Sequence, residues 1–171
     1  HPTDLARRMN RRLAPGVVSV PRHVDGAVRV QVSDPKTNEQ LLRALREVAL
    51  EWMQRLQTFH PYLSGPVWHG SATRHTAICL QLFCEDPKAA ELALINMGVR
   101  FDAGSTAGWR GEMVDALSVQ VRCDALQDYV VVHLLMYDQD DLRGALRPDT
   151  RGRTPRGDLA TVRALLHDVG P

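Results

Sequence analysis

Residues 65–83, GPVWHGSATRHTAICLQLF, are the stretch of this sequence from which the fold can be argued. An apolar segment at residues 67–71 ends in Gly70 and Ser71, and a second run, residues 76–83, alternates with a period of two. Side chains alternate between the two faces of a β-strand. We therefore expect residues 67–71 and 76–83 to be neighbouring strands of one sheet, joined through a tight turn at the Gly-Ser pair.

This arrangement has the outline of a site that handles phosphates. Nucleotidyl transfer uses two divalent cations held by carboxylates two residues apart on a strand, and a glycine turn lets backbone donors approach the phosphates. The corresponding positions here are Ala77 and Cys79, which face the same side of the expected strand. Alanine cannot bind a metal, and a lone thiol prefers soft metals to magnesium. The sequence thus predicts the geometry of such a site with no metal bound at the turn and no cofactor.

The other periodic segments indicate an α+β fold. Apolar side chains at spacings of three and four predict a helix of about 20 residues, and they are Leu41, Leu45, Val48, Trp52, Leu56 and Phe59. A second helix is expected over residues 86–98, with Asp86 as its cap, Pro87 at its first position and Gly98 after its end.

Further strands and a last helix follow along the chain. We expect a short strand at residues 99–104, an antiparallel hairpin formed by residues 112–122 and 129–138, and a helix at residues 158–169 capped by Asp158. The order predicts one mixed sheet of four or five strands with helices mainly on one face.

The N-terminal region is expected to lie outside this unit. Residues 4–13 are typical of a short basic helix, residues 14–22 contain two prolines, and residues 27–32 are either a brief edge strand or an extended lead-in. We therefore divide the chain into an N-terminal segment, residues 1–36, and one folded domain, residues 37–171.

Composition excludes several classes of protein. The 171 residues are 44% hydrophobic and 24% charged, and no apolar run approaches the length needed to cross a bilayer, so we expect no membrane partner. Three cysteines without a CxxC pair and without an export signal predict reduced thiols and a cytoplasmic protein. A net charge of +1 gives no general attraction to nucleic acid.

Positive charge is nevertheless concentrated in residues 143–156, RGALRPDTRGRTPR, which hold five arginines. Guanidinium groups bind phosphates in a bidentate manner, so a nucleotide, another phosphorylated molecule or a nucleic acid could be held there, although such a run is also typical of a solvated loop. If this segment crosses near the Gly-Ser turn, the two would line one mouth. The predicted ligand-binding residues are Gly70, Ser71, His75, Cys79, His133, Arg151 and Arg153.

Histidines and cysteines allow further hypotheses about a metal site or a nucleophile. His69, His75 and His133 could form a transition-metal site, but their spacing is no signature. The simpler expectation places His69 at a strand end, His75 on a solvent-facing turn, and His133 half-buried and hydrogen-bonded in an apolar strand. Cys79 is either a nucleophile beside a histidine or a buried thiol that fills space in the sheet.

Three segments of the sequence together resemble a known protein family. ALREVALEWM in the long helix, GPVWHGSATRHTAICLQLFCEDPKAAELALINMGVRF and RPDTRGRTPRGDLATVRALL together resemble a family of small bacterial proteins with a nucleotidyltransferase-like fold, over some three-quarters of the chain. The resemblance implies an acid where Ala77 stands and a third carboxylate near His133. Such proteins are often labelled UDP-N-acetylmuramate–alanine ligases, but that activity needs a GxxxxGK[ST]-type loop or its equivalent, and neither Lys36 nor Lys88 follows a glycine.

Three functions remain open at this point. The first is a catalytically degenerate nucleotidyltransferase-like protein that binds a nucleotide or another phosphorylated ligand. The second is a regulatory or protein-interaction scaffold with no small-molecule site. The third is an active transferase with a rearranged set of acids drawn from Glu85, Asp86 and Asp138. The catalytic residues are unassigned, because fold alone does not settle function.

Overall fold

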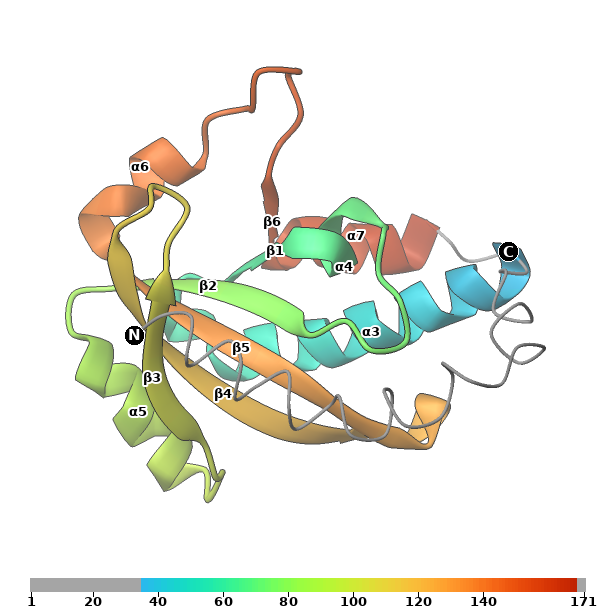
Figure 1. The fold of residues 1–171 in the computed structure, drawn as a ribbon, viewed down its shortest axis with the longest axis horizontal. Helices are drawn as coiled ribbons and strands as arrows, with labels where there is room; N and C mark the ends of the chain where they lie inside the picture. The colour runs from blue at the N-terminus through green and yellow to red at the C-terminus, as the bar shows by residue number, and fades with distance from the viewer. Residues whose placement is uncertain (1–34, 169–171) are drawn as a thin grey trace, which may run out of the picture.

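The computed structural model describes residues 35–168, and its first element is the long helix α3 (Pro35–Arg55) (Figure 1). The expectations for residues 4–13, 14–22 and 27–32 lie outside the described residues. Side chains of α3 at helical spacing are buried along one face, namely Leu45, Val48, Ala49, Trp52 and Met53, and Leu56 just after the helix is buried too. The periodicity of the sequence therefore predicted this helix correctly. A short 3₁₀ turn, η1 (Gln57–Phe59), follows it.

A mixed sheet lies against α3, and its described strands number six, in the order β3-β4-β5-β2-β1-β6. The strands are β1 (Tyr62–Ser64), β2 (Ile78–Cys84), β3 (Asp102–Ala107), β4 (Met113–Cys123), β5 (Asp128–Asp138) and β6 (Arg156–Asp158). β2 pairs with β5 in parallel, and all other neighbours are antiparallel. The α+β class and the β4–β5 hairpin are confirmed. The sheet has more strands than the four or five predicted, because β1 and β6 have three residues each, too few to show a period.

The helices pack on one face of the sheet. Ile78, Leu80 and Leu82 of β2 point to that face and join one core with side chains of the four main helices. Besides α3 these helices are α4 (Gly65–His69), α5 (Pro87–Asn96) and α7 (Leu159–Asp168). The opposite face is covered at one end by α6 (Leu142–Ala145), whose Ala145 packs with Phe83, Val114 and Tyr137.

Two helix starts follow the signals in the sequence. The Asp86 carboxylate accepts a hydrogen bond from the Lys88 backbone N–H at 3.0 Å, and Pro87 occupies the first turn of α5. Asp158 caps α7 by accepting hydrogen bonds from the Thr161 N–H at 2.8 Å and the Thr161 hydroxyl at 2.6 Å. Both carboxylates satisfy amides that the helix itself leaves unpaired.

One prediction about the fold is wrong. Residues 67–71 do not form a strand, because residues 65–69 are the helix α4, which ends at Gly70 in the left-handed conformation (φ 92°). Pro66 suits the first turn of a helix, where the missing N–H costs nothing. The Arg46 guanidinium donates to the carbonyls of Val67 and Trp68, both at 2.9 Å, and so satisfies this short helix at its end. The strand that pairs with β2 is therefore β1.

Candidate functional site

A row of polar side chains crosses the sheet on the face away from the four main helices. The register aligns one residue from each strand in direct cross-strand pairs, and in sheet order they are Asp102, Ser118, His133, Cys79, Ser64 and Arg156. We call these six residues the polar row. Because side chains alternate along a strand, the next residues in each central strand face the helices and are apolar, as with Leu80 and Leu134.

The Ser-Gly turn beside this row is not the one expected from the sequence. β1 ends at Ser64, and Gly65 follows in the left-handed conformation (φ 75°), which favours glycine. A Cβ built on Gly65 would lie 3.7 Å from the Cβ of Cys79, and the Ser64 hydroxyl donates to the Cys79 carbonyl at 3.4 Å. The strand beside β2 thus ends in a turn of small residues, as predicted, but this turn lies six residues earlier in the sequence than the Gly70-Ser71 pair. The positions that share its face of β2 are Cys79 and Gln81 rather than Ala77, which precedes the strand.

His133 occupies the middle of the polar row, between Cys79 on β2 and Ser118 on β4. The side chain is half-buried, as expected, but its Nδ1 atom is buried and has no hydrogen-bond partner among the residues that the structure describes. The expectation of a hydrogen-bonded histidine is therefore wrong for this atom. Burial lowers the pKa of His133 to about 4, so the ring is neutral near pH 7. Buried polar atoms without a partner are rare and costly in folded proteins.

Cys79 is neighboured by the hydroxyl of Ser64 on one strand and by His133 on the other. Burial raises the pKa of the Cys79 thiol, and the hydrogen bond with Ser64 offsets this only in part. A nucleophilic cysteine acts as the thiolate, and a raised pKa disfavours that form. The geometry thus fits a space-filling thiol better than a nucleophile.

The Gly70-Ser71 turn has its amides already engaged. The N–H groups of Gly70 and Ser71 both donate to the Pro66 carbonyl, at 2.8 and 3.0 Å, and thereby end helix α4. His75 lies exposed in the following turn, as expected. The neighbouring Arg74 donates to the Leu126 carbonyl at 2.8 Å, which ties this loop to the end of the β4–β5 hairpin.

The basic segment folds as a loop around one carboxylate. Asp149 accepts hydrogen bonds from the backbone N–H groups of Arg151 and Arg153, both at 2.9 Å, and these bonds lower the pKa of Asp149. Both arginine side chains are exposed. The Trp68 indole N–H donates to the Thr154 carbonyl at 2.8 Å, so the loop passes beside α4 before it enters β6. Its tip projects at the top of Figure 1.

Arg156, the last arginine of that segment, lies on the sheet itself. Its Nε donates to the Gln81 side chain at 2.6 Å, an Nη donates to the Ala145 carbonyl, and the guanidinium lies 4.9 Å from the centre of the Trp109 ring. Burial lowers the pKa of Arg156 from its ordinary value. Sequence reasoning missed this role, because nothing in the composition separates Arg156 from the four other arginines of the segment.

Aromatic rings continue the same face beyond Gln81. Phe83 contacts the three others, with ring centres at 5.6 Å from Tyr62, 5.9 Å from Trp109 and 5.5 Å from Tyr137. The Tyr137 hydroxyl accepts a hydrogen bond from the Trp109 backbone N–H at 3.3 Å, and burial raises the pKa of Tyr137 to about 12. The face therefore offers hydroxyl, thiol and imidazole groups at one end, aromatic rings at the other, and Arg156 between them.

Acidic residues and histidines do not gather on this face. Within the described part of the chain, no three His, Cys, Asp or Glu side chains lie close enough to hold a metal ion. This applies to the trio His69, His75 and His133. It also applies to Glu85, Asp86 and Asp138, of which Asp86 serves as the cap of α5. His69 moreover ends helix α4 rather than a strand, which corrects the expectation for that residue.

The chain matches no protein-family model, no curated protein and no solved structure. A function is therefore argued from the chemistry of the polar row and the groups around it. Among residues 35–168, no helix combines the length and the apolar character that crossing a membrane requires.

Proposed function

We propose that this protein is a catalytically degenerate nucleotidyltransferase-like protein that binds a nucleotide or another phosphorylated ligand across the polar row. The observation that carries the proposal is the buried Nδ1 atom of His133, which has no partner among the described residues. Buried polar atoms are normally paired with protein or with ordered molecules. A ligand that donates a hydrogen bond to this atom would remove the cost of leaving it unpaired.

Binding is favoured over transfer by the groups at the centre of the row. The positions beside the Ser64-Gly65 turn are Cys79 and Gln81, of which one is a thiol with a raised pKa and the other a neutral amide. Magnesium and manganese need oxygen ligands, chiefly carboxylates. We therefore assign the face a binding role and derive no reaction step from it.

A phosphorylated ligand is favoured by the cations on this side of the molecule. Arg156 lies beside Gln81 and over Trp109, where its guanidinium adds positive charge to this face. Arg151 and Arg153 lie a few residues earlier in the same segment, with exposed side chains. We place this activity in the cytoplasm, on the ground that Cys79, Cys84 and Cys123 are all free thiols.

Thermal unfolding of the full chain against nucleoside phosphates, sugar phosphates and inorganic phosphate tests the proposal. A ligand at a hundred times its dissociation constant adds about 2.7 kcal/mol of stability. The rise in Tm of each variant is measured relative to that variant without ligand. A panel that raises the Tm with none of the compounds would contradict the proposal.

Matched variants locate the site. We expect His133→Phe and Ser64→Ala to abolish or weaken the rise in Tm. Ser71→Ala should leave it unchanged, because Ser71 follows the end of helix α4 and is not part of the polar row. Arg151→Ala combined with Arg153→Ala should weaken the response. Arg100→Ala combined with Arg163→Ala, which removes two exposed cations from other elements, is the control.

The alternative role of a protein-interaction scaffold is favoured by a different observation. β4 extends beyond its neighbour β3, so that among the described strands part of its edge has no neighbour.

A further inference from the structure

Strand β4 is longer than the strand beside it. β3 pairs with β4 only as far as Ser118, which lies opposite Asp102, whereas β5 pairs with β4 as far as Cys123. Residues 119–123 therefore have a partner strand on one side and no described strand on the other. Within residues 35–168, no strand pairs with the backbone N–H and C=O groups that point away from β5 in this segment, and such groups can pair with another extended chain.

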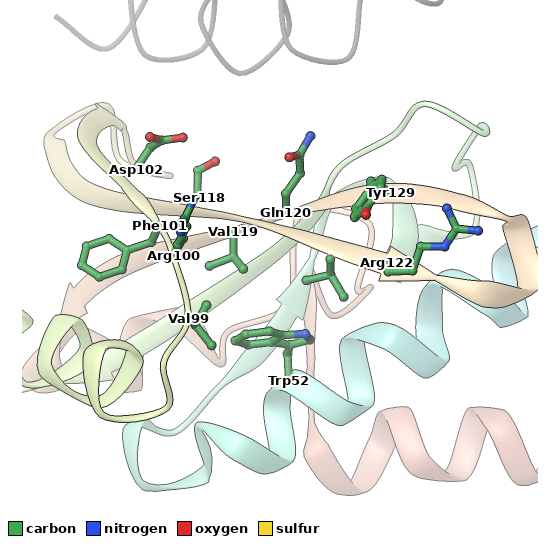
Figure 2. A pocket seen from close by; sticks show the side chains of 11 residues that line it. Trp52, Val99, Arg100, Phe101, Asp102, Ser118, Val119, Gln120, Arg122 and Tyr129 are labelled. Atoms are coloured by element: carbon green, nitrogen blue, oxygen red, sulfur yellow. The ribbon is translucent and has the colours of Figure 1, made fainter.

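A groove of about 560 Å³ follows this open edge. Its lining includes Val119 and Val121 from one face of β4, and Ser118, Gln120 and Arg122 from the other. Residues from both faces of one strand can border the same groove only if the groove runs along the edge of that strand. Figure 2 shows Trp52 and Val99 on one side of β4, with Gln120 and Ser118 on the other.

The two sides of the groove differ in chemistry. Trp52, Val99 and Val121 supply apolar surface on the side of the core, and Trp52 belongs to the buried face of α3. On the other side Arg122 lies 5.5 Å from the centre of the Tyr129 ring. Arg122 also forms an ion pair with Asp124 at 3.5 Å, and because the Asp124 side chain is 96% exposed, solvent screens this pair.

Charge along the open segment is positive. Arg100 and Arg122 line the groove. Among the described residues that line it, the one acidic side chain is Asp102, at the end where β3 still pairs with β4. An added strand would place alternate side chains toward Trp52 and toward Arg122. Apolar residues suit the first set of positions, and carboxylates suit the second.

We propose that the open edge of β4 binds an extended peptide segment of another protein, with apolar and acidic side chains in alternation, as an added strand. The segment spans about five residues, matching positions 119–123 at a strand rise of ~3.3 Å per residue. Main-chain hydrogen bonds supply affinity, and Val121 and Arg122 supply selectivity. This site is distinct from the polar row and does not depend on ligand binding there.

Fluorescence anisotropy with the full chain and a labelled peptide, acetyl-Val-Glu-Val-Glu-Val-amide, tests this inference. Two control peptides accompany it: one with the central valine replaced by proline, which removes a main-chain donor, and one with lysine in place of glutamate. We expect the parent peptide to bind about tenfold more tightly than either control, because it alone keeps both the cross-strand charge pairs and the complete set of main-chain hydrogen bonds.

Protein variants provide the second arm. Arg122→Glu should weaken binding of the parent peptide and strengthen binding of the lysine peptide, whereas Arg143→Glu, an exposed cation on α6, should change neither. Hydrogen exchange should slow at residues 119–123 when the peptide is bound. Equal binding of the three peptides, absence of binding, or protection of this edge through self-association in the absence of peptide would each overturn the inference. The last outcome would make a second copy the occupant.

Discussion

Cys79 and His133 lie side by side on the two parallel strands at the centre of the sheet. The hydroxyls of Ser64 and Ser118 flank them on the outer neighbours. Neither ring nor thiol carries a charge near pH 7, because burial lowers the pKa of His133 and raises that of Cys79. The centre of the face is thus polar but uncharged, and the charge state of His133 and Cys79 should depend on pH.

Acidification should destabilise the protein through His133. Its pKa is about 4 in the folded state against 6.5 as the ordinary value, so between these values the unfolded chain binds more protons and stability falls as pH falls. At pH 5 the loss from this residue is about 2 kcal/mol relative to pH 7.5. Urea unfolding across this pH range measures it. His133→Phe should flatten this part of the profile, and His75→Phe, on an exposed turn, should not.

Thiol chemistry should report the burial of Cys79. In a Cys84→Ser, Cys123→Ser double variant, only Cys79 can react with a disulfide reagent such as Ellman's reagent. Because reaction requires the exposed thiolate, we expect labelling at pH 8 to be slower than in urea by about a hundredfold or more. Rapid labelling of the folded double variant would instead indicate an accessible, activated thiol and would support the nucleophile reading.

Gly157 should not tolerate a side chain. A Cβ built on this buried strand residue would overlap the ring of Trp68, whose indole N–H is fixed on the Thr154 carbonyl. Overpacking of this kind costs about 1–3 kcal/mol, so Gly157→Ala should lower the free energy of unfolding by that amount. In a double-mutant cycle with Trp68→Leu, the cost of Gly157→Ala should shrink. Additive costs would show that the ring is not the obstacle.

Arg46 should stabilise helix α4 by its shape as well as by its charge. Its two hydrogen bonds reach the carbonyls of Val67 and Trp68, and burial lowers its pKa. We expect Arg46→Met to cost about 1–3 kcal/mol in urea unfolding, and Arg46→Lys to recover only part, because an ammonium cannot reproduce the planar fork. Arg163→Met, which removes an exposed cation from α7, is the matched control.

Long elements could be read from the sequence because their patterns repeat. The apolar stripe of α3 and the alternation in the β4–β5 hairpin extend over enough residues to exclude another structure. The starts of α5 and α7 were predicted from their capping residues, Asp86 and Asp158. β1 and β6 were missed since three residues show no period. Residues 67–71 were misassigned because the helix there is one turn long and depends on Arg46, a contact that lies 21 residues away in sequence.

The candidate site was predicted in part. Cys79 and His133 were named from their strands, and the register brings them together. Ser64 and Gln81 were not predicted as site residues, and Arg156 was considered only as one arginine of the basic segment. Their roles depend on how β1 and β6 lie beside β2, which the sequence did not reveal. Ser71 was predicted in place of Ser64. The pairs Ser64-Gly65 and Gly70-Ser71 both suit a tight turn after a strand, and only the helix between them distinguishes the two.

Pairing of β1 with β6 has a consequence for the order in which this protein folds during synthesis. Tyr62 pairs with Asp158, so the strand formed early in the chain acquires its outer neighbour only after nearly a hundred further residues have left the ribosome. Helix α7, which follows β6 directly and packs on α3, arrives at the same late stage. Until then the edge of β1 and one side of α3 lack their final cover, and a nascent chain halted near Ala145 should be a preferred client of chaperones that bind exposed apolar surface.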